Sequence, residues 1–231
     1  MITRVAVVPY PPLLVPALTV RADAETERLR GACSRAVSSL ADSSAEWVVV
    51  GVDQSGPTRF SPDTAGTFAG FGRDVRVSLG GAQDPDPHLP LPVLIAGLLR
   101  EQAGARTAEV RLLAPGTPVD ECADVGSELA GRDAALLVLA EGSNRADERS
   151  SRAPDPRARP LDDRLARALA EVDTDALRAL DPELCAELGV PRAALQVLPG
   201  VVEEGTWRGE LLHSATPFGV TYHVATWTRE D

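Results

Sequence analysis

The stretch Trp47-Val48-Val49-Val50-Gly51-Val52-Asp53 decides the fold of this chain. It is an almost uninterrupted apolar run, which is typical of a strand covered on both faces, whereas a half-exposed strand alternates apolar and polar residues. Gly51, Asp53 and Gly56 place a loop at its carboxyl end. The stretch therefore predicts a strand inside a sheet that carries helices on both faces.

Working outward, short β-branched runs alternate with longer helical patterns. Further strands are predicted at residues 5–8, 75–79, 110–113, 135–140 and 220–227. Helices are predicted at residues 23–40, 91–102, 119–129 and 193–202, and at 161–188 in pieces capped near Asp173 and Asp181. The order predicts a single α/β domain over residues 1–231, with a mostly parallel sheet of roughly six or more strands.

Two segments do not follow this alternation. Residues 60–72 are rich in Gly, Thr and Phe, which predicts a surface loop or an edge hairpin. Residues 141–160 form a polar stretch too long for a simple connection, which predicts a functional lid or a mobile loop.

Composition excludes several classes of protein. The net charge of −11 argues against nucleic acid as a partner, since phosphate binding needs a clustered basic surface. The arginines of residues 145–159 are interleaved with acids, as in a solvated loop. The three cysteines are far apart, so they predict neither disulfides nor a zinc site. Four prolines interrupt the apolar run at residues 5–18, which predicts a cytoplasmic protein with no membrane helix. A homo-oligomer is compatible with the sequence.

Four segments together resemble a known family. They are Val8-Pro9-Tyr10-Pro11-Pro12-Leu13-Leu14-Val15-Pro16; Trp47 to Asp53 with Thr58-Arg59; Leu137-Val138-Leu139-Ala140-Glu141-Gly142-Ser143-Asn144-Arg145, leading into Arg157-Ala158-Arg159-Pro160-Leu161-Asp162; and Pro217-Phe218-Gly219-Val220-Thr221-Tyr222-His223-Val224-Ala225-Thr226-Trp227. In this order they look like the class III extradiol ring-cleavage dioxygenases of the LigB-like type, in an actinobacterial group.

The resemblance implies an open α/β fold with its active site at the carboxyl ends of the strands. It also implies Fe(II) held by two histidines and a glutamate, with a further histidine that handles protons. Such a set holds iron on one face and leaves positions open for oxygen and a catechol.

This chain departs from that pattern at each matched position. Tyr10 stands at the first histidine ligand, and Asp53 is the nearest match to the second. The glutamate ligand falls near residues 189–195, where Arg192 is the only polar side chain. Glu141, followed by Gly142 and Ser143, stands where the proton-handling histidine is expected. An uncharged tyrosine is a poor Fe(II) ligand, so the usual extradiol reaction is not predicted.

The candidate catalytic residues are Tyr10, Asp53 and His88. Tyr10 is a proton donor or a residue packed between prolines, and Asp53 is a ligand-binding residue or a turn cap. His88 precedes a helix and is a pocket residue or a solvated one. The candidate substrate-binding residues are Arg59, Glu141 and Ser143. His213 and His223 flank a turn without a nearby carboxylate, and His223 is expected to be surface-facing or packed in the sheet.

Three hypotheses follow. The first is a degenerate superfamily member that keeps the fold and the crevice, lacks a cofactor, and binds a ligand, assists a partner or catalyses a changed reaction. The second is a dioxygenase acting on a catechol-like aromatic, with Fe(II) or another divalent metal in a rearranged site of Asp53, His88 and Glu141. The third is an acidic interaction module that recruits a protein partner through residues 141–160.

Overall fold

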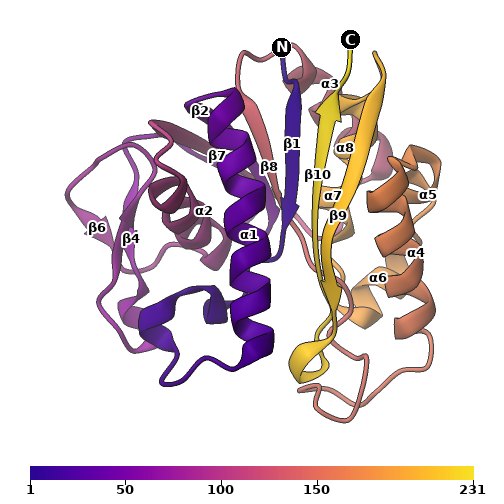
Figure 1. Cartoon of the computed structure of the whole chain (residues 1–231), viewed down its shortest axis with the longest axis horizontal. Coiled ribbons are helices and arrows are strands. Elements are labelled where there is room, and N and C mark those ends of the chain that lie inside the picture. Colours follow the sequence, from indigo (N-terminus) through magenta and orange to yellow (C-terminus); the bar gives the residue numbers. More distant parts are fainter.

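The apolar run that begins at Trp47 lies within a seven-stranded sheet in the computed structural model, which describes all 231 residues (Figure 1). The strand order is β3 (Thr58–Phe60), β7 (Thr107–Leu113), β2 (Glu46–Val52), β8 (Ala135–Leu139), β1 (Arg4–Val8), β10 (Tyr222–Arg229) and β9 (Trp207–Ala215). Every residue of β2 after Glu46 is buried, as expected for a strand covered on both faces.

The predicted single-domain α/β class is confirmed, but the sheet is mixed. Strands β7, β2, β8 and β1 are parallel neighbours, whereas β3, β10 and β9 are each joined by antiparallel pairing. The sequence analysis did not predict β9. Together with β10 it forms a hairpin, connected by a short turn that includes η4 (Pro217–Gly219), and this hairpin makes that side of the sheet antiparallel.

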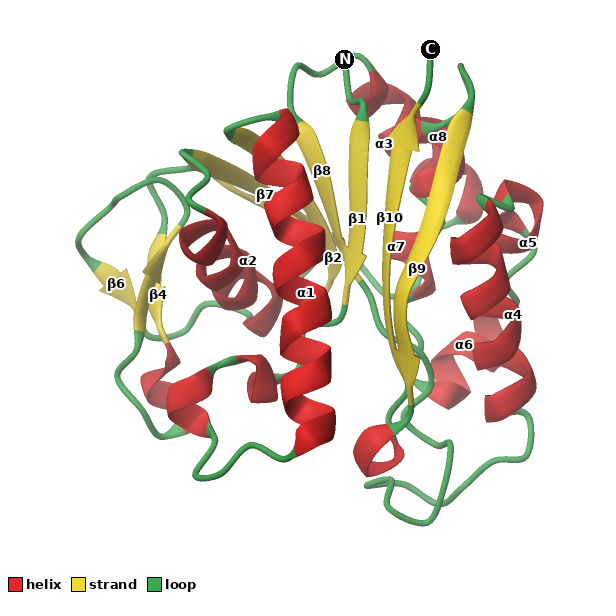
Figure 2. Ribbon diagram, viewed as in Figure 1, coloured by secondary structure: helices red, strands yellow, loops and turns green.

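Helices cover both faces of the sheet (Figure 2). On one face α1 (Ala24–Ser43) and α2 (Leu91–Ala103) bury one apolar cluster. On the other face a second cluster lies under α3 (Val119–Ala130), α4 (Ala158–Glu171), α5 (Thr174–Arg178), α6 (Pro182–Leu188), α7 (Arg192–Leu195) and α8 (Leu198–Val201). Strand residues alternate between the two clusters, so the sheet separates two cores.

The helix starts follow from side-chain caps. Asp23, Asp173 and Asp181 each accept a hydrogen bond from the backbone N–H three residues later. Such a bond satisfies one of the free N–H groups of a first helical turn. The caps predicted at Asp173 and Asp181 are therefore confirmed, whereas the helix predicted at residues 193–202 is two short helices, α7 and α8.

Residues 60–79 differ from the prediction. β4 (Ala65–Thr67), β5 (Arg76–Ser78) and β6 (Pro85–Asp86) form a separate three-stranded sheet, so the strand predicted at residues 75–79 lies outside the main sheet. The segment predicted to be a surface loop or an edge hairpin includes β4, which pairs antiparallel with β5, and contains Phe68, which is fully buried at the start of η3 (Phe68–Phe71). Burial of Phe68 and Val77 beside α2 accounts for this ordered structure.

The segment from Glu141 to Arg157 contains no helix or strand. It is nevertheless tied to the turn of the β9-β10 hairpin, because Ser150 Oγ donates to the Gly219 carbonyl at 2.7 Å. Within the segment, Arg145 Nε donates to the Ala153 carbonyl at 2.8 Å. No helix of the structure is both long enough and apolar enough to span a membrane.

Candidate functional site

The candidate site lies where β1, β2 and β8 end and β10 begins, at the lower edge of the sheet in Figure 1. Tyr10, Asp53 and Glu141 follow these three strands within two residues. The open α/β sheet places such residues at one edge, where this class of fold binds its ligands. Tyr222 opens β10 at the same edge because β10 runs antiparallel to β1.

Glu141 is the residue whose chemistry is most altered by its surroundings. Its Oε2 atom is buried and has no hydrogen-bond partner. Burial raises the pKa of this carboxyl to about 7, although the backbone N–H of Tyr10 opposes the shift. Loss of water disfavours the charged form of a carboxyl, and this burial is the dominant cause here. Glu141 therefore exchanges a proton near neutral pH.

The neighbouring phenols are uncharged. Burial raises the pKa of Tyr10 above its ordinary value, and the charges of Glu141 and Asp53 raise it further. Burial and the charge of Glu141 act in the same direction on the pKa of Tyr222. The side chain of Asp53 also accepts from the Ser55 hydroxyl at 2.6 Å, so it stabilises the turn after β2. The structure thus brings Asp53 and Glu141 each close enough to Tyr10 for their charges to raise its pKa.

His223 belongs to this site, and sequence reasoning did not select it. It is packed in the sheet with 2% of its surface exposed, and its Nδ1 lies 3.1 Å from Ser214 Oγ. Its Nε2 has no partner and lines the same narrow void as Glu141, which is too small for water. Burial lowers the pKa of His223 to about 4, helped by His213 and opposed by Asp163.

A buried hydrogen-bonded frame holds the start of the 141–157 segment. Asp162 of α4 accepts from the Ser143 N–H at 2.7 Å and from the Thr221 hydroxyl at 2.6 Å. Burial raises the pKa of Asp162, although these two bonds oppose the shift. Between these partners a side chain on Gly142 would lie 2.5 Å from Asp162 Oδ1 and 3.1 Å from His223 Nε2.

Ser143 is part of that frame, in contrast to its predicted substrate-binding role. It is fully buried, its hydroxyl accepts from the Arg145 N–H at 3.0 Å, and its carbonyl accepts from the Thr221 N–H at 2.9 Å. Its backbone bonds to Asp162 and Thr221 connect the start of this segment to α4 and to the end of the β9-β10 turn.

Three other residues singled out in the sequence lie outside the group. His88 is exposed between β6 and α2, where its N–H donates to Asp86. Arg59 is exposed on β3 and pairs with Glu128 of α3 at 3.3 Å. Arg192 is buried in α7, where it donates to Gln196 Oε1 at 2.5 Å and to the Thr117 carbonyl at 3.0 Å.

The side chains do not fit the iron that the resemblance implies. No group of three or more His, Cys, Asp or Glu residues is arranged to hold a metal ion. Near Glu141 the structure offers Asp53 as a second carboxylate, Tyr10 as an uncharged phenol and His223 as a single imidazole. Fe(II) of the extradiol type needs two imidazoles and a carboxylate on one face, which these residues do not supply.

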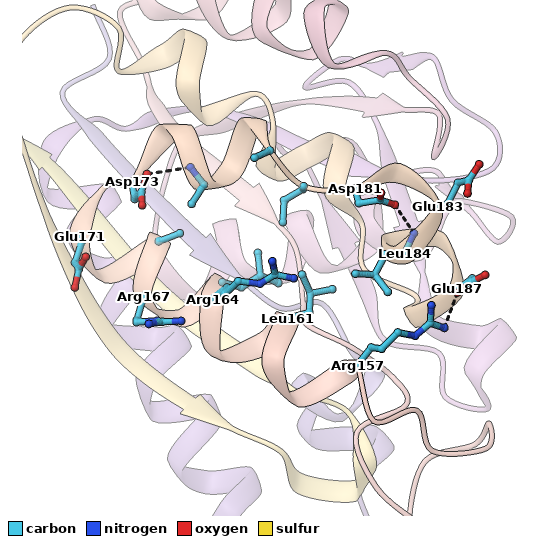
Figure 3. A pocket seen from close by; sticks show the side chains of 15 residues that line it. Arg157, Leu161, Arg164, Arg167, Glu171, Asp173, Asp181, Glu183, Leu184 and Glu187 are labelled. Atoms are coloured by element: carbon cyan, nitrogen blue, oxygen red, sulfur yellow. Dashed lines mark hydrogen bonds and ion pairs between the residues drawn. The ribbon is translucent and has the colours of Figure 1, made fainter.

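A larger cavity lies elsewhere in the molecule. It has a volume of about 660 Å³ and lies between α4 and the pair α5-α6 (Figure 3). Its rim carries Arg164 and the ion pair of Arg157 with Glu187 at 2.6 Å. Tyr10, Asp53, Glu141 and His223 do not line it.

Comparison with known proteins supports the fold. No family model matches the chain, and no curated protein matches it. An uncharacterized protein from Escherichia coli K12, JW3007, has a similar solved structure with a TM-score of 0.61 and 12% sequence identity. The match covers 98% of this chain and 99% of that one, so the two share their fold over nearly their whole length.

Proposed function

We propose that this protein is a member of the class III extradiol dioxygenase superfamily that binds a small polar ligand without iron and exchanges a proton with it through Glu141. The observation that carries the proposal is the buried, unpartnered Oε2 of Glu141 at the carboxyl end of β8. A buried polar atom without a partner costs stability, and functional sites are where such a cost is retained.

The position of Glu141 supports the acid–base role. The resemblance places the family's proton-handling histidine directly after this strand. An ordinary glutamate is ionised at neutral pH, but burial raises the pKa of Glu141 to about 7, close to that of an ordinary histidine. A carboxyl with this pKa accepts and donates protons near pH 7, as general acid–base chemistry requires.

The neighbours of Glu141 indicate the class of ligand. Tyr10 and Tyr222 are uncharged phenols near enough to Glu141 for its charge to raise their pKa values, so their hydroxyl groups can serve as hydrogen-bond donors and acceptors at this edge. Such groups match the hydroxyls of a phenol or an enol better than a fully charged phosphate, which Glu141 and Asp53 would repel. We therefore expect a catechol-like hydroxylated aromatic that binds by hydrogen bonds at the edge formed by Tyr10 and Asp53 and is deprotonated by the Glu141 carboxylate. The void beside Glu141 has no room for this ligand, so binding requires the edge to open.

The test measures the binding of catechol to the metal-free protein, with EDTA present, by calorimetry at a series of pH values between 5.5 and 8.5. We expect the affinity for catechol to change with pH about a midpoint near 7. We expect Glu141→Gln to weaken this affinity about tenfold, which corresponds to about 1.4 kcal/mol of binding free energy. Glu148→Gln is the matched control, because Glu148 is an exposed acid of the same segment.

Two results would overturn the proposal. One is an absence of saturable binding by catechol and protocatechuate alike. The other is binding that keeps its affinity and pH dependence in Glu141→Gln, since the proton exchange would then belong to another group.

A further inference from the structure

A second polar pocket lies at the opposite end of the sheet, between α1 and the strands β1, β10 and β9. Its volume is about 280 Å³, and only one of its nine lining residues is hydrophobic. Ligand pockets of drug-sized molecules are larger and mostly apolar. This pocket is therefore suited to a small charged group rather than to an apolar molecule.

The strand register explains why arginines meet there. Arg4 pairs with Thr228, and Thr228 pairs with Arg208, so the three residues form one row across β1, β10 and β9. Adjacent strands lie about 4.8 Å apart, which places the two arginine backbones about 10 Å apart on either side of Thr228. Both guanidinium groups can reach a group held above the threonine.

Helix α1 adds a third arginine from above the sheet. Arg35 and Ser39 are four residues apart, which places them on one face of the helix, and both line the pocket. Arg35 forms no ion pair or hydrogen bond, and Arg208 pairs with Glu230 at 3.0 Å. Glu210 is the one acid that lines the pocket.

Arg4 supplies the observation that points to a ligand. One of its terminal nitrogens donates to the Thr228 hydroxyl, but its Nε is buried and has no partner. A buried guanidinium N–H without an acceptor is costly, and an oxyanion accepts from two such groups at once. From this unpaired donor and the three converging arginines, we propose that the pocket binds a small oxyanion, in particular a phosphate group.

The surroundings make this pocket unusual for the molecule. The chain has a net charge of −11, yet the pocket combines three arginines with the single acid Glu210. A local excess of positive charge in an acidic protein attracts anions to that pocket. Hydroxyl groups of Thr226 and Thr228 lie beside the arginines as additional hydrogen-bond partners.

The experiment titrates the full-length protein with inorganic phosphate, phenyl phosphate and chloride at equal ionic strength, and follows backbone amide signals by NMR. Equal ionic strength separates site binding from general screening. We expect saturable binding of at least one phosphate species, with shifts in α1, β9 and β10 rather than at Glu141. Tighter binding of phenyl phosphate would identify a phosphate monoester, and tighter binding of inorganic phosphate would identify the free ion.

Two exposed arginines provide the test variants, because their replacement leaves the fold intact. We expect Arg35→Gln and Arg208→Gln each to weaken phosphate binding tenfold or more, while Arg152→Gln in the exposed 141–157 segment changes it less than twofold. Chloride shifts equal to those of phosphate, signals that do not saturate, or unchanged affinity in both pocket variants would overturn the proposal.

Discussion

The two ends of the central sheet treat polar groups in different ways. At the carboxyl ends of the parallel strands, Glu141 Oε2 and His223 Nε2 are buried and unpartnered, and the pKa values of both residues are shifted toward the neutral forms. At the other end, Arg35 and Arg208 remain exposed and charged. Both ends hold a buried polar atom without a partner, Arg4 Nε at one and Glu141 Oε2 at the other, but only the arginine end also presents exposed charged side chains that an external partner can reach.

The largest effect that separates the two ends is expected from Asp162→Ala. Removing this carboxylate leaves the Ser143 N–H and the Thr221 hydroxyl without their buried acceptor. We expect the free energy of unfolding to fall by about 4 kcal/mol, because each buried unpaired donor costs about 1–3 kcal/mol. Urea denaturation measures the change. Asp163→Ala, one residue along on the exposed side of α4, and Arg208→Gln at the other end are expected to stay within about 0.5 kcal/mol.

The next largest effect concerns the pH dependence contributed by Glu141. Its folded-state pKa is raised to about 7 from an ordinary value of 4.5, so the stability it contributes is fully present below pH 4.5 and is lost as pH rises through 7. Relative to Glu141→Gln, we expect the wild-type protein to lose about 3 kcal/mol between pH 4.5 and 7.5. A constant difference between the two proteins across this range would show that Glu141 reaches water.

His223 is expected to act in the opposite direction. Its folded-state pKa is lowered from 6.5 to about 4. The stability that His223 contributes to the protein is therefore fully present above pH 6.5 and is lost as pH falls through 4. Between pH 4.5 and 6.5 the two contributions cancel, which keeps the wild-type contribution of this pair nearly flat. Between pH 7 and pH 3.5 we expect His223 to cost the wild-type protein about 3 kcal/mol of its free energy of unfolding, and His223→Gln to remove this loss. Denaturation of both proteins at each pH measures the difference.

The smallest effect is expected from iron. Protein reconstituted anaerobically with Fe(II) should produce no ring-opened product from protocatechuate or catechol when oxygen is admitted. Three protein ligands are needed on one face of the iron, and no group of three suitable side chains is present. Oxygen uptake and absorbance of the ring-opened product provide the measurement. Product that depends on iron and disappears in Asp53→Ala would reverse this conclusion.

Much of the fold could be predicted because local patterns agree with it. The apolar run at β2 and the caps at Asp173 and Asp181 each specify an element by short-range physics. Strand β9 was missed because its residues alternate between half-buried and exposed and include Gly209 and charged side chains, which weaken a strand pattern. Because β9 and its antiparallel pairing with β10 were not predicted, the predicted sheet was more parallel than the observed one.

The candidate site was predicted in part. Residues that directly follow strands, such as Tyr10 and Glu141, could be placed at one edge because topology alone brings strand ends together. His223 could not be selected, because its importance arises from a void shared with a residue 82 positions away in the chain. Ser143 was assigned to a ligand although Asp162 and Thr221 use its backbone groups, and such long-range bonds leave no local sequence signal.

The close fit around Gly142 has a consequence for how this protein can change over generations. A single methyl group at that position would lie 2.5 Å from Asp162 Oδ1 and 2.9 Å from Thr221 Cβ. A larger residue there requires the Asp162 and Thr221 side chains to shift, which disturbs the hydrogen bond between them. Substitutions at Gly142 are therefore expected to be tolerated only together with changes at Asp162 or Thr221, which lie in other segments of the chain.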